Sequence, residues 1–271
     1  MIYQTFEPHQ DLAPLIKCYW TLESPKADSP GKQTIVPDGC IEMIFHYGDP
    51  YLQYTSQDQQ FLQPACFVIG QLTRPLEIEP TGATGIFSVR FHPDGFLPWA
   101  TRPIKEMENT PVSLEMMFGQ AGQLIGERVI HATSTEQRIE LIEAFLIHTM
   151  MEIAVTDRIV KSAVDMLLTA NGQLSVQSLS RQTHINRRQL ERRFSSAIGL
   201  SPKQLAKTIR FITTLRMLLE NPSTSFTTLA YANDYYDQAH FNKDFKSLTG
   251  LTPGEFYKDN LRMSALFYSQ E

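Results

Sequence analysis

The sequence contains one short unit twice, and this duplication limits the folds open to the C-terminal part of the chain. The segment NRRQLERRFSSAIGLSPKQL at 186–205 aligns with DQAHFNKDFKSLTGLTPGEF at 237–256 after a shift of 51 residues. The alignment pairs Leu190 with Phe241, Phe194 with Phe245 and Leu205 with Phe256. Since apolar residues at a helical spacing mark the face that a helix buries, we expect two copies of one small helical unit.

Start and stop signals for helices surround both copies. A capping residue with Gln or Glu three positions later occurs at Asn186, Ser201 and Thr252. Proline occupies the first helical position at 202 and 253, and glycine ends the preceding helix at 199 and 250. Between the copies, an apolar stripe is formed by Leu205, Ile209, Ile212, Leu215 and Leu219. The stripe predicts one long helix that ends at Asn221-Pro222.

A shorter helical segment precedes each copy, SVQSLSRQTHI in the first case and SFTTLAYANDYY in the second. Two helices joined by a tight turn form the layout of a DNA-reading helix-turn-helix unit. The turn needs a residue that tolerates a positive φ angle, and His184 and Asp234 stand at that position. The sequence therefore predicts two helix-turn-helix units joined by a long helix.

The second helix of each unit turns polar side chains away from its core face. In the first unit Arg188, Arg192 and Ser195 point outward, Glu191 lies on the shoulder, and Arg187 and Arg193 flank the apolar stripe. In the second unit the outward residues are Ala239, Lys243 and Lys246, with Gln238 and Asn242 beside them. Arginine can bind guanine and Asn or Gln can bind adenine through paired hydrogen bonds. We expect these residues to contact double-stranded DNA.

The charge of the chain is divided unevenly along its length. Residues 1–155 hold 9 Lys and Arg against 19 Asp and Glu, whereas residues 156–271 hold 15 against 10. A basic C-terminal part beside an acidic N-terminal part indicates a polyanion partner for the C-terminal part alone. The alternative reading of the charge is a helical bundle with a solvated basic surface.

The N-terminal part reads as short strands separated by turns. The runs KQTIVPDGCIEMIFHYGDP and ACFVIGQLTRPLEIEPTGATGIFSVRFHP predict an antiparallel barrel or sandwich, with a cupin-like barrel as one form. We also expect a short helix at 94–100, a capped helix at 136–151 and a linker near Ile153–Thr156. The overall expectation is an α+β chain with a β-rich domain at 1–153 and a helical domain at 154–271.

The helical part resembles the AraC/XylS (arabinose-regulator) family of bacterial transcription factors over residues 157–260. The signature of the second unit reads LAYANDYYDQAHFNKDFKSLTGLTP, from Leu229 to Pro253. Asp234 departs from the glycine that members usually carry, and His184 departs in the corresponding place of the first unit. The resemblance implies base contacts by Arg188, Glu191, Arg192, Gln238, Ala239, Asn242 and Lys243. The stretches VPDGCIEMIF and GIFSVRFHP resemble, more weakly, N-terminal sensor-like domains of some members.

Other chemistry is less supported by the sequence. Candidate ligand-binding residues in the N-terminal part are Trp20, Asp38, Glu42, Phe45, Phe91 and Trp99. A metal set could be drawn from Cys40, Glu42, His46 and His92, but the closely spaced histidines of a cupin metal site are missing, so we expect neither metal nor cofactor. No GxSxG anchors a hydrolase. An enzyme or ligand-binding barrel with a helical appendage is the competing reading.

The partners follow from these expectations. Double-stranded DNA is the main one, a small-molecule effector is a candidate for the N-terminal domain, and RNA polymerase is a partner if the chain activates transcription. The wide apolar stripe of the 136–151 helix suggests a homodimer contact. No apolar run is long enough to span a membrane, no secretory signal leads the sequence, and three scattered cysteines indicate a reducing, cytoplasmic setting.

Overall fold

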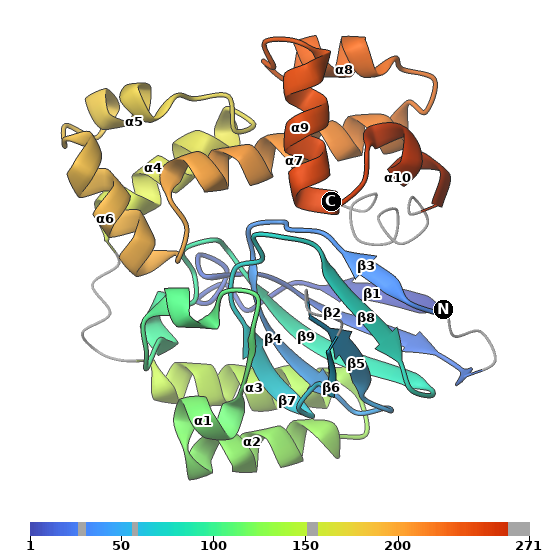
Figure 1. Cartoon of the computed structure of the whole chain (residues 1–271). Coiled ribbons are helices and arrows are strands. Elements are labelled where there is room, and N and C mark those ends of the chain that lie inside the picture. Colours follow the sequence, from blue (N-terminus) through green and yellow to red (C-terminus); the bar gives the residue numbers. More distant parts are fainter. Residues whose placement is uncertain (27–30, 56–58, 151–156, 260–271) are drawn as a thin grey trace.

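The computed structural model describes residues 1–26, 31–55, 59–150 and 157–259. It has two domains, and Figure 1 shows the β-sheets of the first between two sets of helices. Helices α1 to α3 lie beneath the sheets, whereas α4 to α10 form the second domain above them. The linker expected near Ile153–Thr156 lies outside the described residues.

The strands form two antiparallel sheets. The six-stranded sheet has the order β1-β2-β9-β4-β7-β10, and the four-stranded sheet has the order β3-β8-β5-β6. The strands are β1 (Ile2–Phe6), β2 (Ile16–Ser24), β3 (Gln33–Ile35), β4 (Ile41–His46), β5 (Tyr51–Tyr54), β6 (Gln60–Leu62), β7 (Cys66–Ile69), β8 (Leu76–Pro80), β9 (Thr84–Phe91) and β10 (Pro111–Ser113). The antiparallel prediction is confirmed. The described residues form two separate sheets rather than one closed barrel, so the cupin-like form stays a prediction.

The central strands of the six-stranded sheet are buried on both faces. On β4, Met43 and Phe45 belong to the core that faces the helices, whereas Glu42 and His46 line a cavity on the other side. Strand β9 divides in the same way, because successive side chains of a strand point to opposite faces. This two-sided burial explains why all eight residues of β9 are buried.

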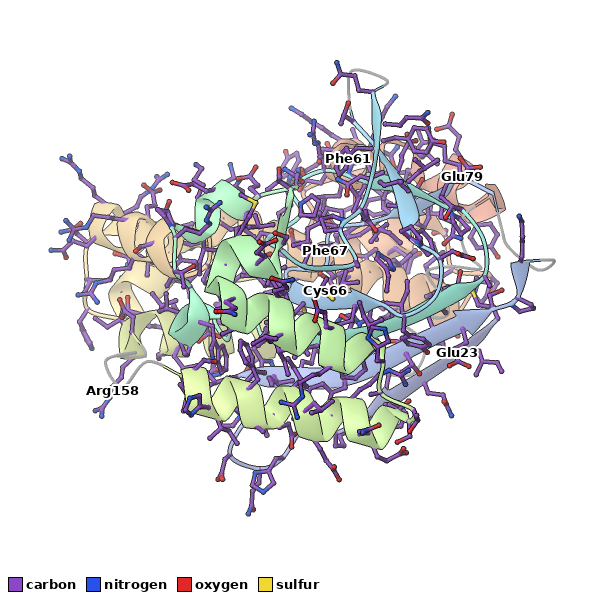
Figure 2. All side chains as sticks on the ribbon, turned by 90° about the horizontal axis from the view of Figure 1, so that it is seen from below. Glu23, Phe61, Cys66, Phe67, Glu79 and Arg158 are labelled. Atoms are coloured by element: carbon purple, nitrogen blue, oxygen red, sulfur yellow. The ribbon has the colours of Figure 1, made fainter. Side chains whose placement is uncertain are left out.

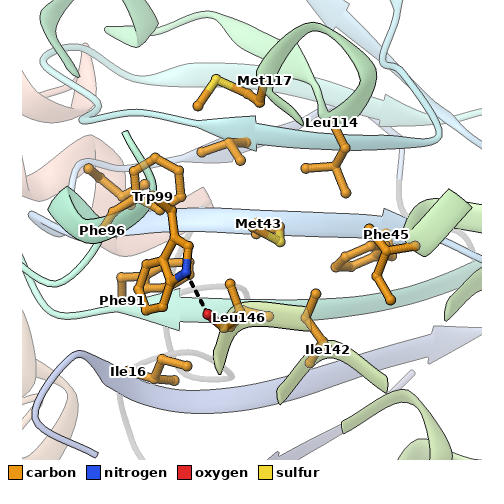
Figure 3. Packing of buried hydrophobic residues seen from close by; sticks show 14 of the residues in the cluster. Ile16, Met43, Phe45, Phe91, Phe96, Trp99, Leu114, Met117, Ile142 and Leu146 are labelled. Atoms are coloured by element: carbon orange, nitrogen blue, oxygen red, sulfur yellow. Dashed lines mark hydrogen bonds between the residues drawn. The ribbon is translucent and has the colours of Figure 1, made fainter. Parts of the chain in front are cut away.

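Three helices close the lower face of this sheet: α1 (Leu114–Phe118), α2 (Gln120–Ile130) and α3 (Thr135–Thr149). Figure 3 shows their core, in which the Trp99 ring packs beside Phe91 and its Nε1 donates to the Leu146 carbonyl oxygen at 2.9 Å. In Figure 2, seen from below, α2 and α3 run across the sheet, and Cys66 lies against α2. Gly126 permits this approach, because a Cβ there would lie 3.0 Å from the Cys66 sulfur.

One of the two helices expected in the first domain differs from the structure. The segment 94–100 contains only a single 3₁₀ turn, η2 (Leu97–Trp99), because Pro98 and the turn before it leave room for no longer helix. The helix predicted at 136–151 is α3, which Ser134 caps by accepting a hydrogen bond from the Gln137 amide. Most of its apolar stripe packs into the core of its own domain: Ile139, Leu141, Ile142, Phe145 and Leu146. Met150 and the neighbouring Ile147 are the apolar residues at its end that stay exposed.

The second domain contains seven helices in the described part of the chain. They are α4 (Arg158–Thr169), α5 (Val176–Gln182), α6 (Arg187–Ala197), α7 (Pro202–Glu220), α8 (Phe226–Ala232), α9 (Gln238–Thr249) and α10 (Pro253–Asp259). The long helix α7 ends at Asn221 as predicted. Its first half contributes Leu205 and Ile209 to the core of the first unit, and its second half contributes Phe211 and Leu215 to the core of the second.

The fold predicts a large loss of stability when the second core loses one of its rings. Phe245 is 1% exposed and packs edge-on against Phe211, Phe241 and Phe256. We expect Phe245→Ala to lower the free energy of unfolding by about 3–5 kcal/mol, because it removes buried apolar surface and leaves a cavity. Urea denaturation measures this value. The neighbouring exposed change Lys246→Ala should stay within about 0.5 kcal/mol of the parent, and equal losses for the two variants would contradict the packing.

Candidate nucleic-acid interface and ligand cavity

Each helix-turn-helix unit has a residue with a positive φ angle at the same position of its turn. His184 follows α5 with a φ of 56°, and Asp234 follows α8 with a φ of 56°. Both positions therefore need the left-handed backbone conformation that the sequence pattern indicated. In the second unit, the Asn233 amide nitrogen Nδ2 donates to the Leu229 carbonyl oxygen at 2.9 Å and holds the end of α8. The two turns therefore share one backbone conformation at this position.

The second helices of the two units, α6 and α9, are called the reading helices after their predicted role. Both begin with matched caps. The Asn186 side chain accepts a hydrogen bond from the Gln189 amide at 2.9 Å, and the Asp237 side chain accepts one from the His240 amide at 2.7 Å. Both caps satisfy an N–H group that the first turn leaves without a partner. Phe194 of α6 and Phe245 of α9 lie in the cores of the two units, on the buried face of each helix. The polar faces are left on the outside.

The outward face of α6 carries a row of basic side chains. Arg188 and Arg192 are exposed, and neither forms an ion pair within the described part of the chain. Arg187 pairs with Glu191 at 2.8 Å, but both side chains are largely in solvent, so this pair contributes little and can open. Ser195 is half-buried beside them.

The outward face of α9 is less charged. Ala239, Lys243 and Lys246 are exposed. Gln238 accepts a hydrogen bond from the Thr227 hydroxyl at 2.6 Å, which orients its amide at the start of the helix. Asn242 is half-buried, and its Oδ1 atom has no partner in the part of the chain that the structure describes. This face offers amide groups and cations together.

One basic residue of α6 has a different role. Arg193 donates to the Asp157 carboxylate at 2.7 Å, and the same carboxylate caps the first turn of α4. Its guanidinium therefore joins α6 to α4 within the second domain. The expectation that it reaches sideways to a phosphate would require this contact to open.

The C-terminal ends of both reading helices are seated on the first domain. A Cβ on Gly199, at the end of α6, would lie 3.1 Å from Ile104 of η3 (Ile104–Met107). A Cβ on Gly250, at the end of α9, would lie 3.7 Å from the Pro75 ring. Figure 1 shows both helices running from their turns down toward the first domain, α6 next to the start of α7 and α9 across its middle. Their N-terminal ends point away from it.

A cavity of about 100 Å³ lies between the two sheets of the first domain. Of the candidate ligand-binding residues, Trp20, Asp38 and Glu42 line it. Phe45, Phe91 and Trp99 do not, because they lie in the core between the six-stranded sheet and the helices. Glu42 and Phe45 are three residues apart on one strand, and an odd spacing puts them on opposite faces.

An ionic cluster closes one end of this cavity. The Arg90 guanidinium lies 2.7 Å from the Glu42 carboxylate and 3.5 Å from that of Asp38. The Ser88 hydroxyl also donates to Glu42, at 3.2 Å. Burial raises the pKa of Glu42, whereas the positive charge of Arg90 opposes the shift. Arg90 is 5% exposed, so the cluster is held away from bulk water.

The rim of the cavity contacts the second domain. Val36 packs with Phe211, Ile212 and Leu215 in the core of the second unit. A Cβ on Gly39 would lie 3.2 Å from Leu205 of α7. The Gln71 side chain donates to the Gly39 carbonyl oxygen at 2.9 Å and so joins the two loops of the rim.

Sequence reasoning missed part of the cavity wall. Gln33, His46, Gln63 and Arg90 all contribute to it. The alternation along β4 and β9 could have found two of them, because His46 and Arg90 share a face with Glu42. Gln33 and Gln63 come from the second sheet and its loops, and nothing in the sequence pairs these segments with β4.

A metal site and a membrane span have no support in the described residues. No group of three or more His, Cys, Asp or Glu side chains among them is arranged to hold a metal ion. None of the described helices combines the length and apolar character needed to cross a bilayer.

Comparison with protein families finds one match in each half of the chain. Residues 4–113 match a family described as a domain of unknown function (DUF6597), and residues 179–259 match a family described as a helix-turn-helix domain. The sequence matches no curated protein.

Solved structures of ToxT from Vibrio cholerae are loosely similar over almost the whole chain. One aligns with a TM-score of 0.49 at 10% identity and covers 95% of this chain and 98% of that chain. ToxT from strain O395 gives 0.47 at 13% identity, with 94% and 97% covered. ToxT bound to an unsaturated fatty acid gives 0.44 at 10% identity, with 88% and 93% covered.

The strained turn gives a direct stability test. We expect His184→Gly to raise the free energy of unfolding by up to about 1 kcal/mol, because glycine adopts a positive φ without the steric cost that a side chain carries. Urea denaturation of both proteins measures the difference. The matched control is Thr183→Gly, at a residue with a φ of −85°, which should instead lose stability by about 0.5–1 kcal/mol. A loss in both variants would contradict strain at residue 184.

Proposed function

We propose that α6 and α9 read two successive major-groove segments of one duplex. The chain belongs to the AraC/XylS family of DNA-binding transcriptional regulators. The helix-turn-helix match at 179–259 identifies a regulator rather than an enzyme. One observation supports the two-segment reading most directly: two exposed polar helix faces belong to units that share one stiff helix. The core of α6 includes Leu205 and Ile209 of α7, and α9 packs on Phe211 of the same helix.

The proposed base contacts differ between the two helices. On α6, Arg188 and Arg192 would bind guanine through paired hydrogen bonds, and Glu191 would accept from a cytosine amino group. Arg187 and Ser195 would contact the phosphate backbone at either side. Because the first helix offers arginines and an acid, we propose that it contributes more sequence preference than the second.

On α9, Gln238 and Asn242 would bind adenine, Lys243 would also contact a base, and Lys246 would hold a phosphate. Ala239 offers only a methyl group, which suits an apolar contact with thymine. The exposed ring of Tyr236, two residues before this helix begins, would face the phosphate backbone of the DNA. The salt dependence of binding should be steep, because most of these contacts release counterions.

For the N-terminal domain, residues 1–153, we propose a regulatory role exerted through the cavity. A small-molecule effector would lie against Trp20, Asp38 and Glu42. Phe45, Phe91 and Trp99 would support it indirectly, as the core on which the sheet rests. Since Val36 and Gly39 join the rim to α7, an effector that shifts the rim would change how the helical domain, residues 154–271, presents its readers.

Further partners belong to the same proposal. A homodimer would use the exposed end of α3 at Ile147 and Met150, together with exposed apolar residues Met116 and Leu124 on the neighbouring helices. RNA polymerase would be contacted if the protein activates transcription. We place the protein in the cytoplasm, associated with the nucleoid when bound, because its DNA partner lies there.

The reading role of Arg192 can be tested by a single change. Arg192→Ala should weaken binding to the selected DNA site by about 1–3 kcal/mol and relax the preference at one base pair. Binding to random DNA should change less. Fluorescence anisotropy at fixed salt measures both affinities. The control is Arg128→Ala, which removes the same charge from exposed α2 on the opposite side of the molecule. Equal weakening on selected and random DNA would reduce Arg192 to a phosphate contact.

The coupling between domains can be tested at Gly39. This residue has a φ of 82°, and a Cβ there would press on Leu205. Gly39→Ala should therefore strain the rim and change the affinity of the full chain for its DNA by about threefold or more, while residues 157–259 stay folded. Gly31→Ala is the matched control, because a Cβ at that position meets nothing within 4 Å. An unchanged DNA affinity in a measurably destabilised Gly39→Ala protein would show that this contact is structural only.

A further inference from the structure

The cavity has a polar group at each end and an apolar middle. Strand β4 runs along it with Glu42 at one end and His46 at the other, about 13 Å apart at the usual rise of a strand. Between them the wall consists of Trp20, Leu22, Ile44, Ile78 and Ile86. Its volume of about 100 Å³ far exceeds the ~15 Å³ that one water needs and approaches the ~150 Å³ of an engineered cavity that holds benzene. The space suits a small organic molecule with an apolar body.

At the first end, negative charge exceeds positive charge. Arg90 is the basic side chain in the cavity wall, and it already lies between the carboxylates of Glu42 and Asp38. The carboxylate of an incoming ligand would add a third acid to this cluster and would have to displace one of the two present. A ligand that brings a cation or a donor would instead relieve the crowding of acceptors.

At the second end, a chain of hydrogen bonds fixes the protonation of His46. Gln63 donates its amide to Gln53 at 3.0 Å, so its carbonyl oxygen is free to accept from His46 Nε2 at 3.1 Å. The proton of the ring therefore lies on Nε2, and Nδ1 is left as an acceptor. Burial lowers the pKa of His46 to about 4, so the ring is neutral near pH 7.

Two buried polar atoms in this wall lack partners. His46 is 4% exposed and Gln33 is 5% exposed. Within the described residues, neither His46 Nδ1 nor Gln33 Nε2 has a hydrogen-bond partner. A buried polar group without a partner costs free energy, which a bound molecule would recover. His46 Nδ1 needs a donor, and Gln33 supplies one donor of its own.

We propose that the cavity binds a small molecule with an apolar body and a hydrogen-bond-donating end, with a primary amine as the preferred class, and that it discriminates against carboxylates. The donor group lies at the Asp38 and Glu42 carboxylates, and the apolar body fills the space beside Ile44 and Ile86. A second donor or an acceptor on the same molecule would meet His46 or Gln33. This proposal rests on the effector role proposed above and adds the chemistry of the effector.

The position of Asp38 connects this binding to the helical domain. One Asp38 oxygen accepts from the Cys40 amide at 2.9 Å, which holds the turn that contains Gly39. The other oxygen faces Arg90. An amine that binds the Asp38 carboxylate would therefore act on the turn that contains Gly39 and contacts α7.

The test uses three ligands of similar length: n-pentylamine, n-pentanol and pentanoate. The full-length protein carries ¹³C-labelled isoleucine methyl groups, so that Ile44, Ile78 and Ile86 report from inside the cavity. We expect saturable shifts of these methyl signals with pentylamine, weaker binding of pentanol, and pentanoate weaker than pentylamine by about tenfold or more. Equal or tighter binding of pentanoate would overturn the ligand class, and so would the absence of saturable shifts with all three ligands.

Two variants sharpen the result. Asp38→Asn should weaken pentylamine binding by about tenfold and narrow its advantage over pentanoate, because it removes one negative charge from the cluster. Glu140→Gln removes a negative charge from the exposed face of α3 and should change neither. If Asp38→Asn proves unfolded, the ligand comparison on the parent protein still decides.

A DNA-binding measurement on the same samples separates this proposal from the effector role. Selective amine binding that leaves DNA affinity unchanged supports the ligand class and refutes its regulatory coupling. Intact DNA binding without any preference for amine over carboxylate refutes the ligand class and leaves the regulator in place.

Discussion

The arrangement of the molecule depends on the burial of α7 by three partners at once. Its first half completes the core of one helix-turn-helix unit with Leu205, and its second half completes the other with Phe211 and Leu215. Val36 of the first domain enters the second of these cores. Since a close-packed interior does not deform gradually, these shared cores keep the two reading helices at a fixed distance. The same contacts make α7 the element through which the first domain can act on the second.

The six-stranded sheet plays a comparable part in the first domain. Because β4 and β9 are covered on both faces, one set of their side chains supports the helices and the other forms the cavity wall. The ionic cluster of Arg90, Glu42 and Asp38 can exist in that wall because each charge has an opposite partner within the cluster. A single sheet thus separates a largely apolar core from a cavity with polar groups at its two ends.

The helical domain could be predicted almost completely from the sequence, whereas the cavity could not. The caps at Asn186 and Ser201, the left-handed turns at His184 and Gly199, and the end of α7 at Asn221 all depend on local backbone chemistry. Such signals are contained within a few neighbouring residues. The cavity depends on which strands face each other across the two sheets, and Gln33 and Glu42 meet there only through long-range pairing. Grouping Phe45 with Glu42 failed because residue type was used where the parity of strand positions decides the face. The contacts of the reading helices with DNA remain predictions.

Both reading helices end in a glycine that rests on the first domain, at Ile104 in one case and at Pro75 in the other. In the proposed DNA complex, each helix would contact the first domain at the end that lies away from the DNA. The 11 residues of α6 are about 16 Å long, so a rotation of roughly 10° about this contact would move the opposite end by about 3 Å. That distance is the length of a hydrogen bond. Small shifts of the first domain at these two contacts would therefore be enough to bring a proposed base contact into or out of reach.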